Sequence, residues 1–246
     1  DGKTGAPVKG NGKTAPDAGK KNTPKSADEA LLVDVPADYR DLAPFTFQQG
    51  DVVAILGNGL PDRMQHDGWM ETLLQSELRG RQVRFRNMSA SGDRPDSFPR
   101  SSGAMSITEY LQHVKADVVF AFFGYNESFD GVEKAGEYQQ KLVAFVKKTR
   151  ASKANGKSFP RIVLFSPIAH ENTGNPNVPD GKAHNLQLEA YTAATEAAAK
   201  ETGVAFVDLF HPSRQLFKQS SSPLTINGVH LTAEGNRQLA EVIATA

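Results

Sequence analysis

The sequence contains no cysteine, which excludes disulfide bonds, thiolate catalysis and cysteine-ligated zinc. It also lacks an excess of either charge, because 28 basic residues balance 28 acidic ones. A dedicated nucleic-acid-binding protein usually shows a basic excess, so we predict no nucleic-acid partner. No apolar run approaches the roughly 18 residues of a membrane span, and no signal peptide is visible. The 246 residues are enough for one sizeable domain and a tail.

Residues 1–30 have almost no large apolar side chains, since Val8 is the only one before Leu31. Such a segment cannot bury enough apolar surface to offset the entropy cost of becoming ordered. We therefore predict a disordered linker at 1–30 and one folded domain at 31–246. This linker could tether the domain to a fused domain or to a surface, or it could be a passive N-terminus. The sequence leaves both interpretations open.

From Val52 onward, short apolar runs alternate with segments of helical periodicity. The short runs predict five strands, at 52–56, 83–87, 116–124, 161–167 and 204–210. Helical spacing of apolar residues predicts helices at 69–78, 131–152, 182–202 and 232–246, the last with Thr232 as its N-cap. This alternation predicts βαβ units and a three-layer α/β/α sandwich around a parallel, five-stranded sheet. In such sheets the functional site lies at the carboxyl ends of the strands.

Four segments fall at that edge of the predicted sheet: 57–62, 87–93, 124–128 and 225–231. The first reads GNGLPD, and it lacks the spacing and the lysine of a phosphate-binding loop. It also lacks the third glycine of a dinucleotide fingerprint, and we therefore predict no cofactor. The G-x-S-x-G motif of another hydrolase class is absent from the whole chain.

Taken together, the four segments resemble the sequence blocks of the SGNH, or GDSL, hydrolase superfamily. GNGL stands where the family has a GDSL-like turn, and the second segment contains Gly92. GYNES contains Asn126 in a G-x-N motif, and NGVH ends in His230 where the family has D-x-x-H. The resemblance covers roughly residues 50–246. It implies the flavodoxin-like sandwich of that family and an ester hydrolase for small acyl esters, such as acetyl groups on carbohydrates. The implied partner is a small-molecule or glycan ester.

The resemblance also implies roles for particular residues. In the family, the serine of the first block attacks the ester carbonyl, and the histidine of the fourth block accepts its proton. An aspartate three residues earlier orients that histidine, and donors in the first three blocks stabilise the oxyanion. These roles map onto His230, Gly92 and Asn126. However, the nucleophile position is Gly59 and the orienting position is Asn227.

These two departures bear on the expected activity. Gly59 has no hydroxyl group, whereas covalent acyl transfer needs an activated nucleophile. Asn227 can hold the imidazole in the wrong tautomer, which costs on the order of 10⁴-fold in rate in the serine-protease case. Three interpretations remain open: a degenerate hydrolase whose cleft binds a sugar or acylated glycan, a working hydrolase, or an engineered change at Gly59. An interaction domain without catalysis or ligand binding is a further alternative. In a working hydrolase, His230 activates a water molecule, or Ser91 or Ser89 replaces the missing nucleophile.

Further residues in and beside the four segments are candidate ligand contacts. Arg63 suits a carboxylate or sulfate group, and His170 lies in a loop at 166–185 that is too long for a simple connector. We expect that loop to form a wall of the cleft, and we predict no metal site because it has no tight ligand spacing. The linker and the family favour an extracytoplasmic location. The candidate ligand contacts are Asn58, Arg63, Ser91, Glu127 and His170.

Overall fold

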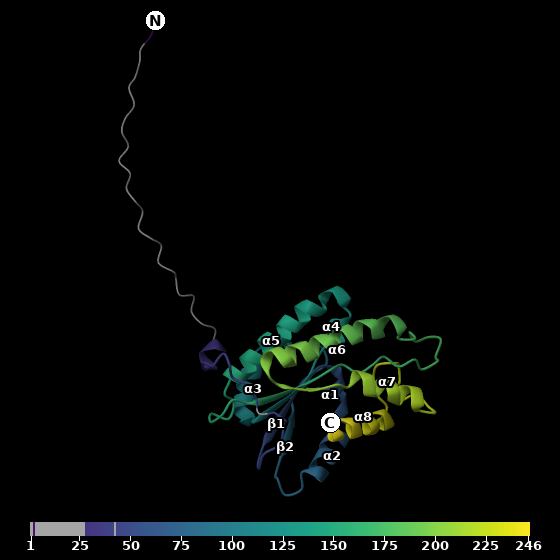
Figure 1. Ribbon diagram of the computed structural model, residues 1–246, viewed down its shortest axis with the longest axis horizontal. Coiled ribbons are helices and arrows are strands. Elements are labelled where there is room, and N and C mark those ends of the chain that lie inside the picture. Colours follow the sequence, from purple (N-terminus) through teal and green to yellow (C-terminus); the bar gives the residue numbers. More distant parts are fainter. Residues whose placement is uncertain (1, 3–27, 42) are drawn as a thin grey trace.

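The computed structural model describes residues 2, 28–41 and 43–246 of the chain (Figure 1). Most of the linker predicted at 1–30 therefore lies outside the described residues. The last part of that range is tied to the domain, because Glu29–Leu31 form a short 3-10 helix, η1. Asp28, directly before it, accepts a hydrogen bond from Ser106 Oγ at 2.7 Å and pairs with Lys148.

A parallel sheet of five strands forms the centre of the domain, in the order β2-β1-β3-β4-β5. All residues of β1 and β3 are buried, because helices cover both faces of the sheet. The three-layer architecture predicted from the alternating pattern is thereby confirmed. The strands are β1 (Val52–Gly57), β2 (Arg84–Asn87), β3 (Val118–Phe122), β4 (Arg161–Phe165) and β5 (Ala205–Val207).

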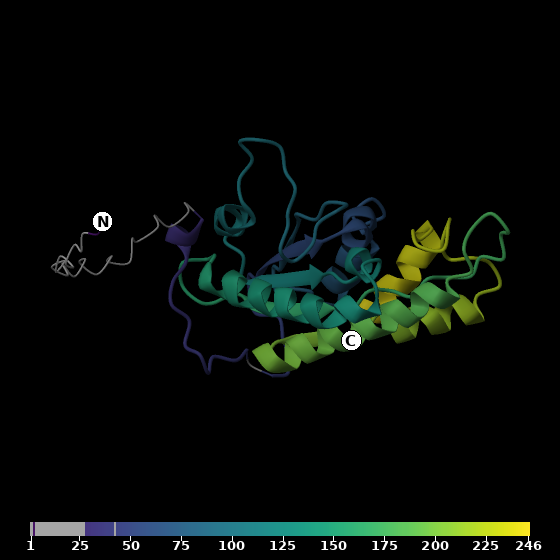
Figure 2. The same ribbon diagram turned by 90° about the horizontal axis from the view of Figure 1, so that it is seen from above.

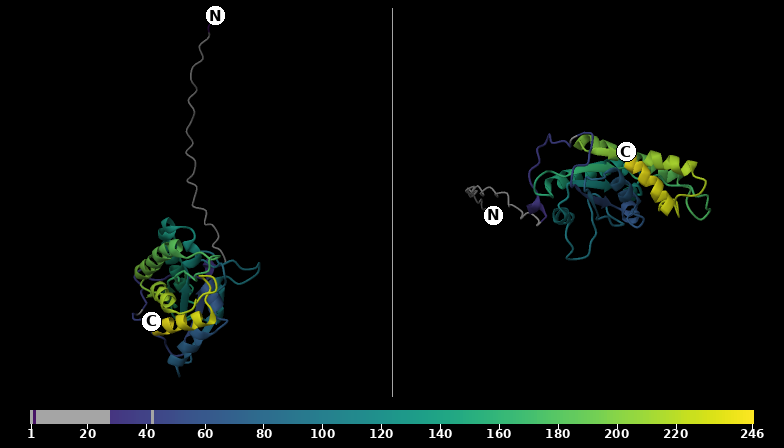
Figure 3. Two further views of the ribbon diagram at one scale, coloured as in Figure 1. Left: turned by 90° about the vertical axis from the view of Figure 1, so that its right-hand side faces the viewer. Right: turned by 90° about the horizontal axis from the view of Figure 1, so that it is seen from below.

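Eight α-helices in the described residues surround this sheet. One apolar cluster packs α1, α2, α7 and α8 against the first face, and a second packs α3, α5 and α6 against the other. Figure 1 shows α5 and α6 on one side of the sheet with α2 and α8 on the opposite side, and Figure 3 shows α8 beside α2. The helices are α1 (Gly59–Met64), α2 (Trp69–Glu77), α3 (Ile107–Val114), α4 (Tyr125–Ser128), α5 (Ala135–Ala151), α6 (Lys182–Thr202), α7 (Phe210–Gln219) and α8 (Ala233–Thr245).

The structure differs from the sequence prediction mainly in its shorter elements. The strand predicted at 204–210 ends at Val207, because Asp208 starts a turn into α7. The Asp208 carboxylate accepts hydrogen bonds from the backbone N–H groups of Phe210, at 2.9 Å, and His211, at 3.2 Å. Helices α1, α3, α4 and α7 were not predicted. The capping role predicted for Thr232 is confirmed, since its Oγ1 accepts a hydrogen bond from the Gly235 N–H at 3.1 Å.

The segment between β2 and α3 forms a long loop that projects from the domain (Figure 2). Its first part carries Gly92 and the second predicted site segment. Within the described part of the chain, no helix is both long and apolar enough to cross a membrane.

Candidate functional site

A cavity of about 290 Å³ opens at the carboxyl ends of β1 and β3. Parallel strands deliver the segments that follow them to one edge of the sheet, so three of the four predicted segments meet here. The α1 and α4 segments form two walls, and the loop at 225–231 forms a third. The lining residues are Asn58, Gly59, Leu60, Arg63, Tyr125, Asn126, Phe129, Ile168, Val229, His230, Leu231 and Asn236.

Gly59 is the first residue of α1 and leaves open space on its cavity side. A Cβ atom built on it would meet one neighbour, Ser91 Oγ at 3.7 Å, which is an ordinary van der Waals distance. The position would therefore accept a serine without strain, yet it presents no hydroxyl group.

The second predicted segment lies directly beside this position but does not line the cavity. The Ser91 hydroxyl donates a hydrogen bond to Asp62 Oδ2 at 2.8 Å, and the Ser91 N–H donates to the same oxygen at 3.1 Å. Ser89 Oγ donates to the Ile55 carbonyl at 3.3 Å. Gly92, which follows Ser91, is exposed. Both hydroxyl groups thus have protein acceptors, and Ser91 is the one next to Gly59.

His230 contacts the side chain of Asn227, as the spacing predicts. Its Nδ1 lies 3.0 Å from Asn227 Nδ2 and 3.1 Å from Asn227 Oδ1. That oxygen already accepts the N–H groups of His230, at 3.0 Å, and Val229, at 3.3 Å. Because an amide oxygen has two lone pairs, the free partner for Nδ1 is the amide N–H. Asn227 thus favours an imidazole whose proton is on Nε2, the opposite of what an aspartate would favour.

The electrostatic environment also favours the uncharged form of His230. Burial lowers the pKa of His230, and the nearby positive charge of Arg63 lowers it further. Arg63 is exposed at the rim of the cavity and forms no ion pair with any described residue.

The loop that carries Asn227 and His230 is held by Glu171, whose carboxylate is 3% exposed. Glu171 accepts hydrogen bonds from Leu224 N at 2.9 Å, Thr225 N at 2.7 Å and Thr225 Oγ1 at 2.5 Å. Its own N–H donates to the Gly228 carbonyl at 2.9 Å. Sequence reasoning gave Glu171 no such role. Its only signal is a position in the long loop after the fourth strand.

Two of the predicted ligand contacts support the walls of the cavity and do not line it. His170 is buried against Gly228, and its Nδ1 lies 3.1 Å from His184 Nδ1. His184 Nε2 lies 2.7 Å from Ser128 Oγ, and burial lowers the His184 pKa to about 4. Glu127 is also buried, where it accepts the Gly124 N–H at 2.8 Å, and burial raises its pKa to about 7.

Three residues that line the cavity each have a buried polar atom without a hydrogen-bond partner among the described residues. These atoms are Asn58 Nδ2, the Tyr125 hydroxyl and Asn236 Oδ1. Burying such a group without a partner costs about 1–3 kcal/mol. Burial also raises the pKa of Tyr125, so its hydroxyl stays neutral and able to donate. The cavity therefore offers unused hydrogen-bonding capacity to a ligand.

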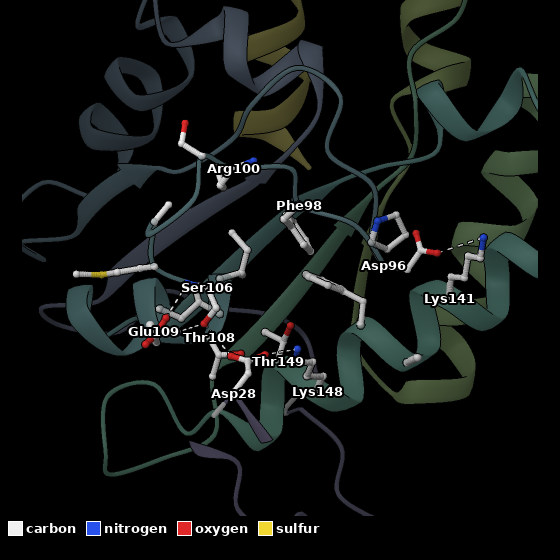
Figure 4. Close-up of a pocket in the computed structure, with 18 residues that line it drawn as sticks. Asp28, Asp96, Phe98, Arg100, Ser106, Thr108, Glu109, Lys141, Lys148 and Thr149 are labelled. Atoms are coloured by element: carbon white, nitrogen blue, oxygen red, sulfur yellow. Dashed lines mark hydrogen bonds and ion pairs between the residues drawn. The ribbon is translucent and has the colours of Figure 1, made fainter. Parts of the chain in front are cut away.

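A larger cavity of about 610 Å³ lies under the projecting loop, between α3 and α5 (Figure 4). Its charged side chains already have partners: Lys141 pairs with Asp96 at 3.2 Å, and Lys148 pairs with Asp28. No unpartnered buried side-chain atom of the described residues lines it. The smaller cavity is the better candidate of the two, because three of its lining residues have an unsatisfied polar atom and none of the described residues that line the larger cavity has one.

Comparisons with known proteins agree with this assignment of the fold. The model of the GDSL-like Lipase/Acylhydrolase family matches residues 57–238, a range that includes the Gly59, Asn126 and His230 segments. No curated protein gives a significant match.

Several solved structures are similar over most of the chain. A catalytic mutant of an acetylxylan esterase from Geobacillus stearothermophilus is 18% identical, with a TM-score of 0.60 over 82% of this chain and 95% of that one. An alpha/beta hydrolase enzyme from the metagenome of Lake Arreo, Spain, is 16% identical, with a TM-score of 0.62 over 81% and 95%. A putative GDSL-like lipase from Parabacteroides merdae is also 16% identical, with a TM-score of 0.60 over 81% and 97%.

Proposed function

This chain belongs to the GDSL-like lipase/acylhydrolase family, and from that premise we propose that its cleft binds a small acyl ester of a carbohydrate without forming a serine acyl-enzyme. Gly59 carries the proposal, because it leaves the cleft open and removes the only hydroxyl that the first block could supply. The similarity to an acetylxylan esterase supports an acetylated sugar as the ligand class.

The contacts of His230 support binding over turnover. A general base needs an unprotonated ring nitrogen facing the reacting group. When the Asn227 amide donates to Nδ1, the ring proton is on Nε2, and this nitrogen is a donor instead of a base. The missing nucleophile and the altered tautomer thus disable the same chemistry at two separate points.

A second candidate function is slow hydrolysis by a water molecule. The observation in its favour is the open space at Gly59, where a Cβ atom would meet only Ser91 Oγ. Oxyanion donors alone retain roughly 10³-fold catalysis over water in the serine-protease case. On this view Asn126 and the Gly59 N–H stabilise the charge while water attacks.

The deciding experiment compares p-nitrophenyl acetate and acetylated xylo-oligosaccharides as substrates for the natural chain, His230→Ala and Gly59→Ser. The binding proposal expects no turnover by the natural chain, and saturable binding of the oligosaccharide in a titration followed by NMR. Turnover that disappears in His230→Ala would contradict it and support the water mechanism. Turnover that instead disappears in Ser91→Ala would identify a displaced nucleophile.

A further inference from the structure

We propose that the cleft selects sugars that carry an anionic oxyacid group, either a carboxylate or a sulfate ester. This inference rests on the proposed function, since it concerns the ligand of the same cavity. Three independent features carry it: the charges on the cavity wall, the unpartnered donors, and the hydrogen bonding of His230.

The wall of the cavity carries positive charge and no negative charge. None of its twelve lining residues is Asp or Glu, and Arg63 is the only one with a permanent charge. The nearest acids along the chain do not line the cavity: Asp62 accepts hydrogen bonds from Ser91, and Asp67 accepts one from Asn236. Arg63 has no ion-pair partner among the described residues, so a ligand anion would meet an uncompensated guanidinium.

The unpartnered groups on this wall are mainly donors. Asn58 is 3% exposed, and its Nδ2 has no acceptor among the described residues. The Tyr125 hydroxyl also has no hydrogen-bond partner among the described residues. The Asn126 amide has only a long contact of 3.5 Å to the Asp93 carbonyl. A neutral hydroxyl group would satisfy one donor at a time, whereas carboxylate and sulfate oxygens have several lone pairs and accept from several donors at once.

Asn58 and Asn227 stand where the GDSL and D-x-x-H patterns have acids, and both amides favour an anionic ligand. Asn58 and Asp have nearly the same shape, but the amide presents N–H groups where a carboxylate would repel an anion. An Asn227 amide that donates to Nδ1 leaves the His230 proton on Nε2, and this tautomer adds another donor to the cavity wall. The two amides therefore preserve the shape of the cleft and remove two negative charges that would repel an anionic ligand.

The size and remaining walls of the cavity suit one sugar ring. At about 290 Å³ it lies at the lower limit of the range for small-molecule sites, so it holds one sugar ring, and the other rings of an oligosaccharide would lie outside it. Apolar side chains, including Leu60, Phe129 and Ile168, can cover the face of a ring. The free Asn236 Oδ1 is an acceptor for a sugar hydroxyl.

The test uses three matched probes with the full chain: methyl β-D-glucuronide, methyl β-D-glucoside 6-sulfate and the neutral methyl β-D-glucoside. Binding is measured by NMR titration of the backbone amides at about 50 mM and about 500 mM NaCl. We expect at least one anionic probe to bind about tenfold or more tightly than the neutral glucoside, and to weaken at the higher salt concentration. The preferred anion then distinguishes a uronic acid from a sulfated sugar.

Variants assign the preference to the cavity. Arg63→Gln is expected to reduce the affinity for the anionic probe about tenfold. Asn58→Asp is expected to reduce it at least as much, because it replaces a buried donor by a carboxylate of the same size. Arg79→Gln is the matched control, since Arg79 is exposed beyond the end of α2 and does not line the cavity. Arg63 is itself exposed, so its substitution tests the charge without threatening the fold.

Equal affinity for charged and neutral probes, or an equal effect of Arg63→Gln and Arg79→Gln, would overturn the anion preference. Failure of all three probes to bind would overturn it as well. These outcomes are separate from failure of the proposed function. Saturable binding of a neutral acetylated sugar, with no preference for charged probes, would overturn the anion preference and leave the proposed function standing. Turnover that depends on His230 would contradict the proposed function, and the charge preference could then be measured as a difference in KM between charged and neutral substrates.

Discussion

Glu171 provides the sharpest test of how the site is assembled. Its buried carboxylate accepts three hydrogen bonds, from Leu224 N, Thr225 N and Thr225 Oγ1. In Glu171→Ala all three donors lose their acceptor in a buried place. At about 1–3 kcal/mol for each unsatisfied donor, the loss in the free energy of unfolding should be at least about 3 kcal/mol. For a chain of this size that corresponds to a fall in Tm of about 6–12 °C.

The measurement is urea unfolding followed by circular dichroism, with calorimetry for Tm. Glu171→Gln keeps one acceptor oxygen but turns an amide group toward a donor, so its stability should fall between those of the natural chain and Glu171→Ala. Glu189→Ala, on an exposed position of α6, is the control and should stay within about 0.5 kcal/mol of the natural chain. A loss of less than about 1 kcal/mol in Glu171→Ala would refute the hydrogen-bonding argument.

Three further predictions concern the histidines and the loop before α8. In a Gly59→Ser background, adding Asn227→Asp should raise the rate of p-nitrophenyl acetate hydrolysis by up to about 10⁴-fold, because the carboxylate restores Nε2 as the base. Equal rates in Gly59→Ser and in the double variant would contradict the tautomer argument. His184, whose pKa is about 4 in the folded chain and 6.5 in the unfolded one, should make stability fall as pH falls through that window, because only the unfolded chain takes up the proton. Urea unfolding at both ends of the window should show a smaller loss in His184→Gln, but not in His113→Gln, which changes an exposed histidine of α3. Gly228→Ala should destabilise the fold about 1–3 kcal/mol more than Gly103→Ala in urea unfolding. Both glycines have φ +84°, but only at Gly228 would a Cβ atom crowd His170 Nε2 and the Glu171 carbonyl oxygen. Equal losses would contradict this steric argument.

The long-range pattern of the fold was predictable because the sheet is buried on both faces. Continuous apolar runs such as Val118–Phe122 mark central parallel strands, and helical spacing marks their covering helices. The shorter elements were missed where their signal is local. Helix α3 has a capping box, in which Ser106 Oγ accepts the Glu109 N–H at 3.2 Å and the Glu109 carboxylate accepts the Ser106 N–H at 2.7 Å. That S-x-x-E signature is readable in the sequence and would have predicted the helix.

Some residues of the candidate site could be predicted from the sequence, and others could not. Asn58, Gly59, Asn126 and His230 meet because each follows or lies near the carboxyl end of the sheet, which is a consequence of topology. The role of Glu171 was not predictable, because its partners are 53 and 54 residues further along the chain. A carboxylate in a polar loop looks the same in the sequence whether it faces solvent or anchors a distant loop.

Unsatisfied hydrogen bonding is even less visible in a sequence, because it is a property of the surroundings and not of the residue. Asn236 lies in α8, 178 positions after Asn58, yet each leaves one polar atom unpartnered on the wall of the same cavity. Only the folded chain reveals that these atoms and the Tyr125 hydroxyl coincide there.

The unsatisfied polar groups of the cavity residues favour a ligand site over a cleft without a use. If the cleft had no use, apolar side chains at positions 58, 125 and 236 would avoid the cost of burying three unpartnered groups. A ligand that satisfies these groups recovers that cost, and ligand binding must then stabilise the folded chain by mass action. On the proposed function, Gly59 supplies no nucleophile, and Asn58 and Asn227 keep the shape of the acids that the family pattern has at their positions. The proposal therefore assigns to this cleft the donation of hydrogen bonds to a ligand in place of attack on an ester.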